Sequence, residues 1–83
     1  MASRYIIFGR TTCPYCVAAT ELLEEKSREM VFVDLSDDPQ AITEAKEFYN
    51  WPTVPIVLEN DNDTGQVTFI GGYTDLSNKL DGE

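Results

Sequence analysis

The segment YIIFGRTTCPYC, residues 5–16, joins an apolar run to a pair of cysteines and organises the rest of the chain around them. Residues 5–8 are continuously apolar, which is typical of a strand buried on both faces. A helical pattern begins at Pro14, whose ring is well tolerated in a first helical turn. We therefore predict a strand, a short loop and a helix, with Cys13 and Cys16 where the loop meets the helix.

Strand-like and helical segments alternate along the remaining chain. The second helix is expected to begin after an Asp38 N-cap and to bury Ile42, Ala45 and either Phe48 or Tyr49. The polar loop of residues 59–66 is short, so its flanking strands should form an antiparallel hairpin. We predict helices over residues 14–29, 39–49 and 74–80, and strands over residues 5–8, 30–33, 56–58 and 67–70.

Composition limits the class of protein. The 83 residues suit one domain, spanning 1–83, with a modest core. The net charge of -9 argues against nucleic acid as a partner, because phosphate binding needs clustered Lys and Arg. We expect no membrane span and no secretory signal, and hence a cytoplasmic protein. With no histidine in the chain, a His-based triad or general base is excluded.

The pair Cys13-Pro14-Tyr15-Cys16 lies near a predicted strand–helix–strand unit, which is typical of a thioredoxin-like redox motif. At a helix N-terminus, free N–H groups and the helix dipole stabilise a thiolate, which is the attacking form of cysteine. Cys16 lies one turn further along on the apolar face and should be the more buried. We therefore predict Cys13 as the nucleophile and Cys16 as the resolving thiol.

Three other roles for the cysteines stay open at this stage. A structural disulfide would close a loop of only four residues and would stabilise the fold little. A zinc site needs about four ligands, and this chain offers two thiols, so zinc binding would require a dimer. The third alternative is that both cysteines are buried and chemically inert, which would not require a position at a helix N-terminus.

Three motifs in the same order resemble those of glutaredoxins, over nearly the whole chain. They are Cys13-Pro14-Tyr15-Cys16, Thr53-Val54-Pro55 and Gly71-Gly72-Tyr73-Thr74-Asp75-Leu76. The resemblance implies a thioredoxin fold of the α/β class, with a four-stranded mixed sheet in βαβαββα order and helices on both faces. It also implies a dithiol glutathione-disulfide oxidoreductase with glutathione as co-substrate and no metal.

The resemblance further implies a glutathione site. Pro55 would be cis and would face the cysteines, the Val54 backbone would bind the cysteinyl part, and Thr53 would line the same groove. Thr74 and Asp75, with Gly72 beside them, would bind the γ-glutamyl end. Two further residues are assigned by position: Arg10 would pair with the glycyl carboxylate and favour the thiolate, and Tyr15 would flank the groove. Gly71-Gly72 as a plain turn, Asp75 as a helix cap and Arg10 as an ordinary surface residue stay open as alternatives.

Trp51-Pro52 departs from the dithiol pattern and is similar to the Trp-Pro of monothiol glutaredoxins. This keeps open an alternative function, a glutathione-ligated [2Fe–2S] cluster held by a dimer that acts as carrier or sensor. Simple packing of Trp51 beside the groove is the default interpretation. A thioredoxin-like enzyme served by a flavoprotein reductase is a third possibility.

On the main interpretation, the protein reduces protein disulfides and glutathione mixed disulfides as a monomer. The resemblance suggests ribonucleotide reductase as a candidate substrate. Catalysis would rest on a stabilised thiolate and on alignment of the sulfur atoms.

Overall fold

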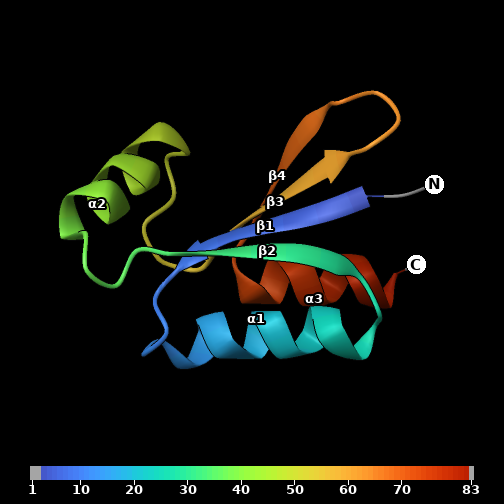
Figure 1. The fold of residues 1–83 in the computed structure, drawn as a ribbon, viewed down its shortest axis with the longest axis horizontal. Coiled ribbons are helices and arrows are strands. Elements are labelled where there is room, and N and C mark those ends of the chain that lie inside the picture. Colours follow the sequence, from blue (N-terminus) through green and yellow to red (C-terminus); the bar gives the residue numbers. More distant parts are fainter. Residues whose placement is uncertain (1–2, 83) are drawn as a thin grey trace.

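The structure is a computed structural model, and it describes residues 3–82. Strands and helices follow one another in the predicted βαβαββα order (Figure 1). The elements are β1 (Ser3–Gly9), α1 (Pro14–Glu25), β2 (Glu29–Asp34), α2 (Pro39–Phe48), β3 (Ile56–Asp61), β4 (Val67–Gly71) and α3 (Tyr73–Asp81).

The four strands form one mixed sheet in the order β2-β1-β3-β4. β1 pairs in parallel with β2 and antiparallel with β3, and β3 pairs antiparallel with β4, as in the expected thioredoxin fold. β1 is thus an inner strand, which explains its continuous apolar run. Tyr5 and Ile7 are fully buried, whereas Ile6 and Phe8 on the other face are partly exposed.

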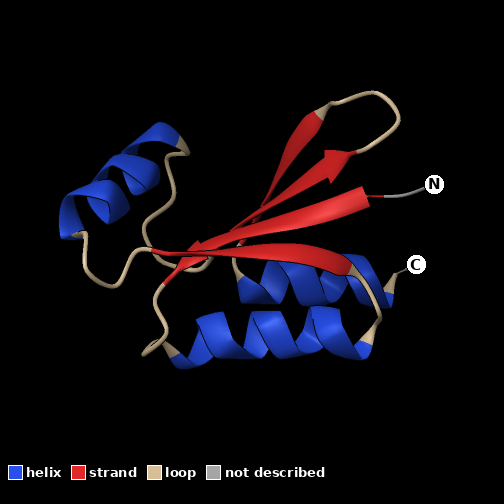
Figure 2. Ribbon diagram, viewed as in Figure 1, coloured by secondary structure: helices blue, strands red, loops and turns tan. Residues whose placement is uncertain are grey.

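Helices cover both faces of the sheet, unequally. α1 and α3 lie side by side across one face, and α2 covers one end of the other (Figures 1 and 2). The main core therefore lies between the sheet and the α1–α3 pair. Its buried members are Tyr5, Ile7, Ala19, Leu23, Val57, Leu76 and Leu80. Full burial of a side chain such as Leu23 contributes about 1.5–3 kcal/mol to the free energy of unfolding.

Helix α1 ends at Glu25, earlier than the predicted end at residue 29. Ser27 has a φ of 57°, in the left-handed region. The N–H of Ser27 bonds to the carbonyl of Glu24 and that of Arg28 to the carbonyl of Leu23. This is a Schellman motif, in which the left-handed position is usually occupied by glycine. Because serine occupies it here, the sequence did not indicate the end of the helix.

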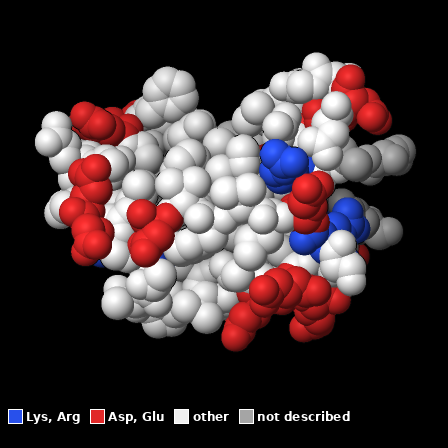
Figure 3. Space-filling view, viewed as in Figure 1, with Lys and Arg blue, Asp and Glu red and all other residues white. Residues whose placement is uncertain are grey.

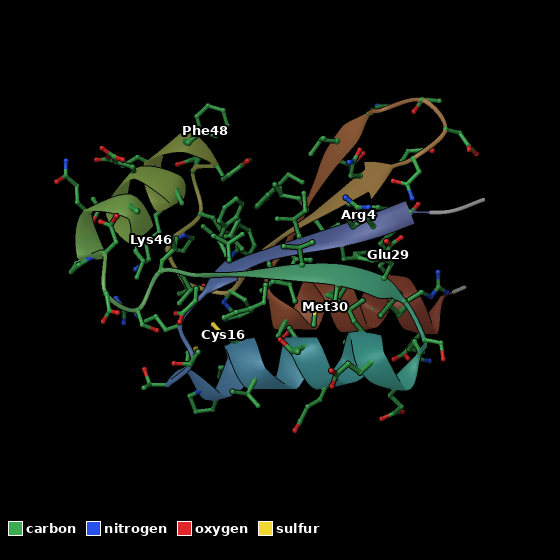
Figure 4. All side chains as sticks on the ribbon, in the orientation of Figure 1. Arg4, Cys16, Glu29, Met30, Lys46 and Phe48 are labelled. Atoms are coloured by element: carbon green, nitrogen blue, oxygen red, sulfur yellow. The ribbon has the colours of Figure 1, made fainter. Side chains whose placement is uncertain are left out.

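Helix α2 starts as predicted, with the Asp38 carboxylate accepting a hydrogen bond from the N–H of Ala41 at 3.0 Å. Of the two aromatic candidates at its end, Tyr49 is the one that packs inward. Its ring stacks on Phe69 with 5.4 Å between centroids. Phe48 is 80% exposed and points away from the sheet (Figure 4).

The β3–β4 hairpin is longer than expected, because its polar residues 59–61 continue the strand ladder. The Asp61 N–H bonds to the Gln66 carbonyl at 2.8 Å and closes the turn. On the face seen in Figure 3, acidic side chains are spread over α2, the lower helices and the hairpin. Within residues 3–82, no helix is both long and apolar enough to span a bilayer.

Candidate active site

Cys13 is the N-cap residue of α1, as the sequence predicted. Its backbone is extended, with φ −88° and ψ 119°, and Pro14 follows in the first helical turn. The Cys13 carbonyl accepts the hydrogen bond from Val17 N–H at 3.1 Å. This geometry directs the first free N–H groups of the helix toward the Cys13 side chain.

The environment of Cys13 lowers its pKa. Partial burial acts to raise the pKa, but hydrogen bonds from the Cys16 N–H, the Cys16 thiol and the Tyr15 N–H outweigh it, and the Arg10 charge adds to them. Each of these groups favours the thiolate over the thiol. Cys13 thus has a larger thiolate fraction at neutral pH than an ordinary cysteine, and its half-buried sulfur is accessible.

Cys16 has the opposite character. It is fully buried, and burial raises the pKa of its thiol to about 11, with the neighbouring Cys13 acting in the same direction. The Arg10 N–H opposes this shift by donating a hydrogen bond to the sulfur at 3.4 Å. Figure 4 shows Cys16 at the N-terminal end of α1, beneath the sheet. The predicted asymmetry in burial between the two cysteines is confirmed.

The loop that precedes β3 faces the cysteines. The Val54–Pro55 peptide bond is cis, as the family resemblance implied. The sulfur of Cys13 lies 3.9 Å from the Val54 carbonyl oxygen, a contact between residues 41 apart in the chain. The fold therefore brings the second motif directly against the first.

A cleft of about 290 Å³ runs from Tyr15 past this loop to the start of α3. All of the expected binding residues except Arg10 line it. The full lining is Tyr15, Trp51, Thr53, Val54, Pro55, Gly72, Tyr73, Thr74 and Asp75. Arg10 is exposed beside the cysteines and acts on both through its charge.

The third motif forms the far end of the cleft. Asp75 caps α3, because its carboxylate accepts the Gly72 N–H at 3.1 Å. Gly71 has a φ of 128°, and a Cβ there would lie 2.6 Å from the Asp75 carboxylate. Gly71 is thus required by the turn and by the close approach of this carboxylate, whereas a Cβ on Gly72 would meet only ordinary contacts.

Tyr73 also lines the cleft, although it was not predicted as a site residue. Its ring packs against Tyr15 with 6.0 Å between centroids, so two tyrosines stand together at the cleft wall. The available signal was its position between Gly72 and Thr74, directly at the start of the third helix.

Trp51 lines the cleft and also packs on Phe69, with 5.4 Å between ring centroids. The backbone N–H of Trp51 bonds to the Lys46 carbonyl at 2.9 Å, and Asn50 before it has a φ of 52°. This Schellman ending of α2 sets the direction in which the tryptophan leaves the helix. The default interpretation of Trp51 as a packing residue is consistent with these contacts.

The site thus combines two cysteines and an adjoining cleft. Cys13 is partly exposed and its surroundings favour the thiolate form, and Cys16 is a buried thiol within the same helical turn. Thiol–disulfide exchange needs a thiolate nucleophile and a second thiol to resolve the product. Both cysteines are free thiols in the structure.

Comparisons with known proteins agree with this arrangement. The family model for glutaredoxins matches residues 5–62. Glutaredoxin 1 of Escherichia coli is 33% identical over 79 residues, covering 87% of this chain and 86% of that protein. The chain also resembles the solution structure of a dithiolic glutaredoxin from Trypanosoma brucei brucei, with 32% identity, a TM-score of 0.69, and coverage of 94% of this chain and 82% of that one.

The buckwheat glutaredoxin–glutathione complex has the same fold. Its TM-score is 0.75 at 20% identity, and the match covers 96% of this chain and 71% of that one. The family model and the Escherichia coli relative together cover most of the chain, including both cysteines. The chain therefore belongs to the glutaredoxin family of thiol–disulfide oxidoreductases.

Proposed function

We propose that this chain is a dithiol glutaredoxin, which reduces protein disulfides and glutathione mixed disulfides at the expense of glutathione. The observation that carries the proposal is the position of Cys13, an N-cap thiol with a lowered pKa whose sulfur lies 3.9 Å from the carbonyl oxygen of Val54, one of the residues that line the cleft. A thiolate poised in this way attacks a disulfide sulfur that the cleft holds in line with it.

Glutathione fits the chemistry of the cleft from end to end. The backbone of Val54 offers hydrogen bonds to the cysteinyl part of the tripeptide, with Thr53 and Pro55 beside it. At the other end, Thr74 and Asp75 take the γ-glutamyl group. The α3 N-terminus suits its carboxylate, and the Asp75 carboxylate suits its ammonium.

The remaining contacts lie at the sides of the cleft. Tyr15 forms a wall, and Gly72 leaves room for backbone approach. Arg10, on the far side of the cysteines, pairs with the glycyl carboxylate. The buckwheat relative, which shares the fold, forms a complex with glutathione, and this supports glutathione as the ligand that we propose.

With a glutathione mixed disulfide as substrate, the Cys13 thiolate attacks the glutathionyl sulfur. A Cys13–glutathione disulfide forms, the old S–S bond breaks, and the substrate leaves as a thiolate that takes up a proton. The thiolate of a second glutathione then attacks the glutathionyl sulfur. Oxidised glutathione leaves, and the Cys13 thiolate is regenerated.

With a protein disulfide, the Cys13 thiolate attacks one substrate sulfur, the substrate S–S bond breaks, and the second substrate sulfur leaves as a thiolate that takes up a proton. Cys16, as its thiolate, then attacks the Cys13 sulfur, which breaks the mixed disulfide, releases the first substrate sulfur as a thiolate and leaves a Cys13–Cys16 disulfide. The neighbouring Cys13 helps to raise the pKa of Cys16. Once Cys13 is in a disulfide its charge is gone, so Cys16 becomes the better nucleophile when it is needed. Two molecules of glutathione then reduce the Cys13–Cys16 disulfide.

The family also supports the wider setting that we propose. The protein acts in the cytoplasm, as a monomer, on disulfide-containing proteins, of which ribonucleotide reductase is the first candidate to test.

The test is glutathione-dependent reduction of a small mixed disulfide by the wild type, Cys13→Ser and Cys16→Ser. The wild type and Cys16→Ser should reduce the mixed disulfide catalytically, and Cys13→Ser should be inactive. Turnover without Cys13, or none in the wild type with glutathione present, would overturn the proposal.

A further inference from the structure

The loop that precedes Cys13 lies beside the loop that leaves β2. β1 and β2 run in parallel, so their C-terminal ends meet at the same edge of the sheet (Figure 1). Gly9 is in register with Asp34, and the Leu35 N–H bonds to the Gly9 carbonyl at 2.8 Å. The segment that leaves β2 therefore begins directly beside the active-site loop.

Ser36 joins the two loops by its side chain. Its hydroxyl donates to the Asp34 carboxylate and accepts the Thr11 N–H at 3.1 Å. The Ser36 N–H also donates to the same carboxylate oxygen at 2.9 Å. These two bonds favour the carboxylate form and lower the pKa of Asp34. With its proton committed to Asp34, the Ser36 oxygen has lone pairs left for Thr11.

Thr11 follows Arg10, whose backbone contacts both cysteines. The Arg10 N–H donates to the Cys16 sulfur at 3.4 Å, and the Arg10 carbonyl accepts the Cys13 N–H at 3.3 Å. The Thr11 N–H belongs to the same peptide unit as the Arg10 carbonyl, so an acceptor for this N–H fixes the unit that accepts the Cys13 N–H.

We propose that Ser36, itself held by Asp34, is a positioning residue that fixes residues 10–12 against Cys13 and Cys16. Without the Ser36 hydroxyl, the Thr11 N–H loses its partner and this loop is held less tightly. The Arg10 N–H and guanidinium then stabilise negative charge on the two sulfurs less effectively, and the thiolate form of Cys13 becomes less populated. The proposal concerns the thiols themselves and does not depend on glutathione being the reductant.

Several other groups face the Cys13 sulfur, and a substitution at Ser36 leaves them in place. From α1 they are the N–H groups of Tyr15 and Cys16 and the Cys16 thiol, and from the loop before β3 it is the Val54 carbonyl. The charged group acting on Cys13 is Arg10. Asp34 is exposed, and its role here is to hold the serine.

The experiment measures the rate at which iodoacetamide alkylates Cys13 as a function of pH, with peptide mass mapping to confirm the site. The variants are Ser36→Ala, Ser36→Thr, which keeps a hydroxyl, and Asp34→Asn, which keeps an acceptor oxygen but loses the charge. The matched control is Thr43→Ala, which deletes a hydroxyl bonded to the Pro39 carbonyl in α2, away from the site. Backbone NMR spectra establish that each variant is folded and report hydrogen exchange at Thr11.

For Ser36→Ala we expect the reactivity profile to move to higher pH, a severalfold lower rate at neutral pH and faster exchange of the Thr11 N–H. Ser36→Thr, Asp34→Asn and Thr43→Ala should stay close to the wild type. A folded Ser36→Ala variant with the wild-type profile would overturn the proposal. So would an Asp34→Asn profile at lower pH, because Asp34 would then act by its charge. The alkylation needs no glutathione, so failure here is distinguishable from failure of the proposed function.

Discussion

The sulfur of Cys16 fills the space that a side chain at Gly9 would need. A Cβ on Gly9 would lie 2.5 Å from that sulfur and 3.2 Å from the Cys16 Cβ. The first distance is too short for non-bonded heavy atoms and the second is tight, and Cys16 is fully buried in a helix that cannot yield freely. The absence of a side chain at the end of β1 is therefore a condition for the position of the resolving thiol.

Gly9→Ala should destabilise the protein by about 1–3 kcal/mol, the usual cost of overpacking a core. It should also slow the reduction of protein disulfides more than that of glutathione mixed disulfides, because only the former need Cys16. Chemical denaturation and the two activity assays measure these effects. Gly82→Ala is the control, since a Cβ there meets only ordinary contacts. Equal losses in both assays, or none, would contradict the account.

The opposite pKa shifts of the two cysteines predict selective alkylation. At neutral pH iodoacetamide should modify Cys13 alone, because its pKa is lowered, whereas Cys16, with a pKa raised to about 11, stays a buried thiol. The rate at Cys13 should level off at a lower pH than for an ordinary cysteine. Peptide mass mapping gives the site. The denatured chain, in which both residues should react, is the control, and preferential labelling of Cys16 in the folded protein would refute the assignment.

Asp75 has two separable tasks, capping α3 and binding the ligand ammonium. Asp75→Ala loses the bond from the Gly72 N–H and should cost about 1 kcal/mol of stability. Asp75→Asn keeps an acceptor oxygen, so it should retain most of the stability while the KM for glutathione rises severalfold. The charge-matched control is Asp63→Asn in the hairpin turn. An unchanged KM in Asp75→Asn would limit this residue to a capping role.

The single tryptophan provides a direct report on the cleft, because Trp51 lines it. Titration with S-methylglutathione, which cannot exchange its sulfur, should change the Trp51 emission and reach saturation as the ligand packs against the indole. The same titration of Asp75→Asn should need a higher ligand concentration. A wild-type emission spectrum that stays constant to millimolar ligand would argue against glutathione in this cleft.

The fold was largely readable from the sequence, because the signals were strong and local. An unbroken apolar run marked the inner strand, and Pro14 and Asp38 marked two helix starts. The end of the first helix was harder, since Ser27 adopts a left-handed conformation that glycine more commonly signals, whereas the second helix ends within one residue of its predicted end. Adjacent aromatics also give no indication of which one turns inward, as the packing of Tyr49 illustrates.

The two cysteines could be singled out from their Cys-x-x-Cys spacing at a predicted helix N-terminus, but the opposite wall of the site could not be predicted in this way. The Val54 carbonyl reaches Cys13 across 41 residues, and its cis bond to Pro55 followed only from the family resemblance. The bond between Ser36 and Thr11 spans 25 residues and depends on the parallel register of two strands. Such contacts are set by tertiary packing and leave no local pattern to read.

The most direct test of the central claim is to trap the mixed disulfide. Reduced Cys16→Ser is incubated with oxidised glutathione, and the adduct is located by peptide mass mapping, with Cys13→Ser as the matched control. The account predicts one glutathione per chain, on Cys13, released again by added glutathione, and no adduct on Cys13→Ser. An adduct on Cys16 in the control, or no adduct on Cys13, would contradict Cys13 as the nucleophile.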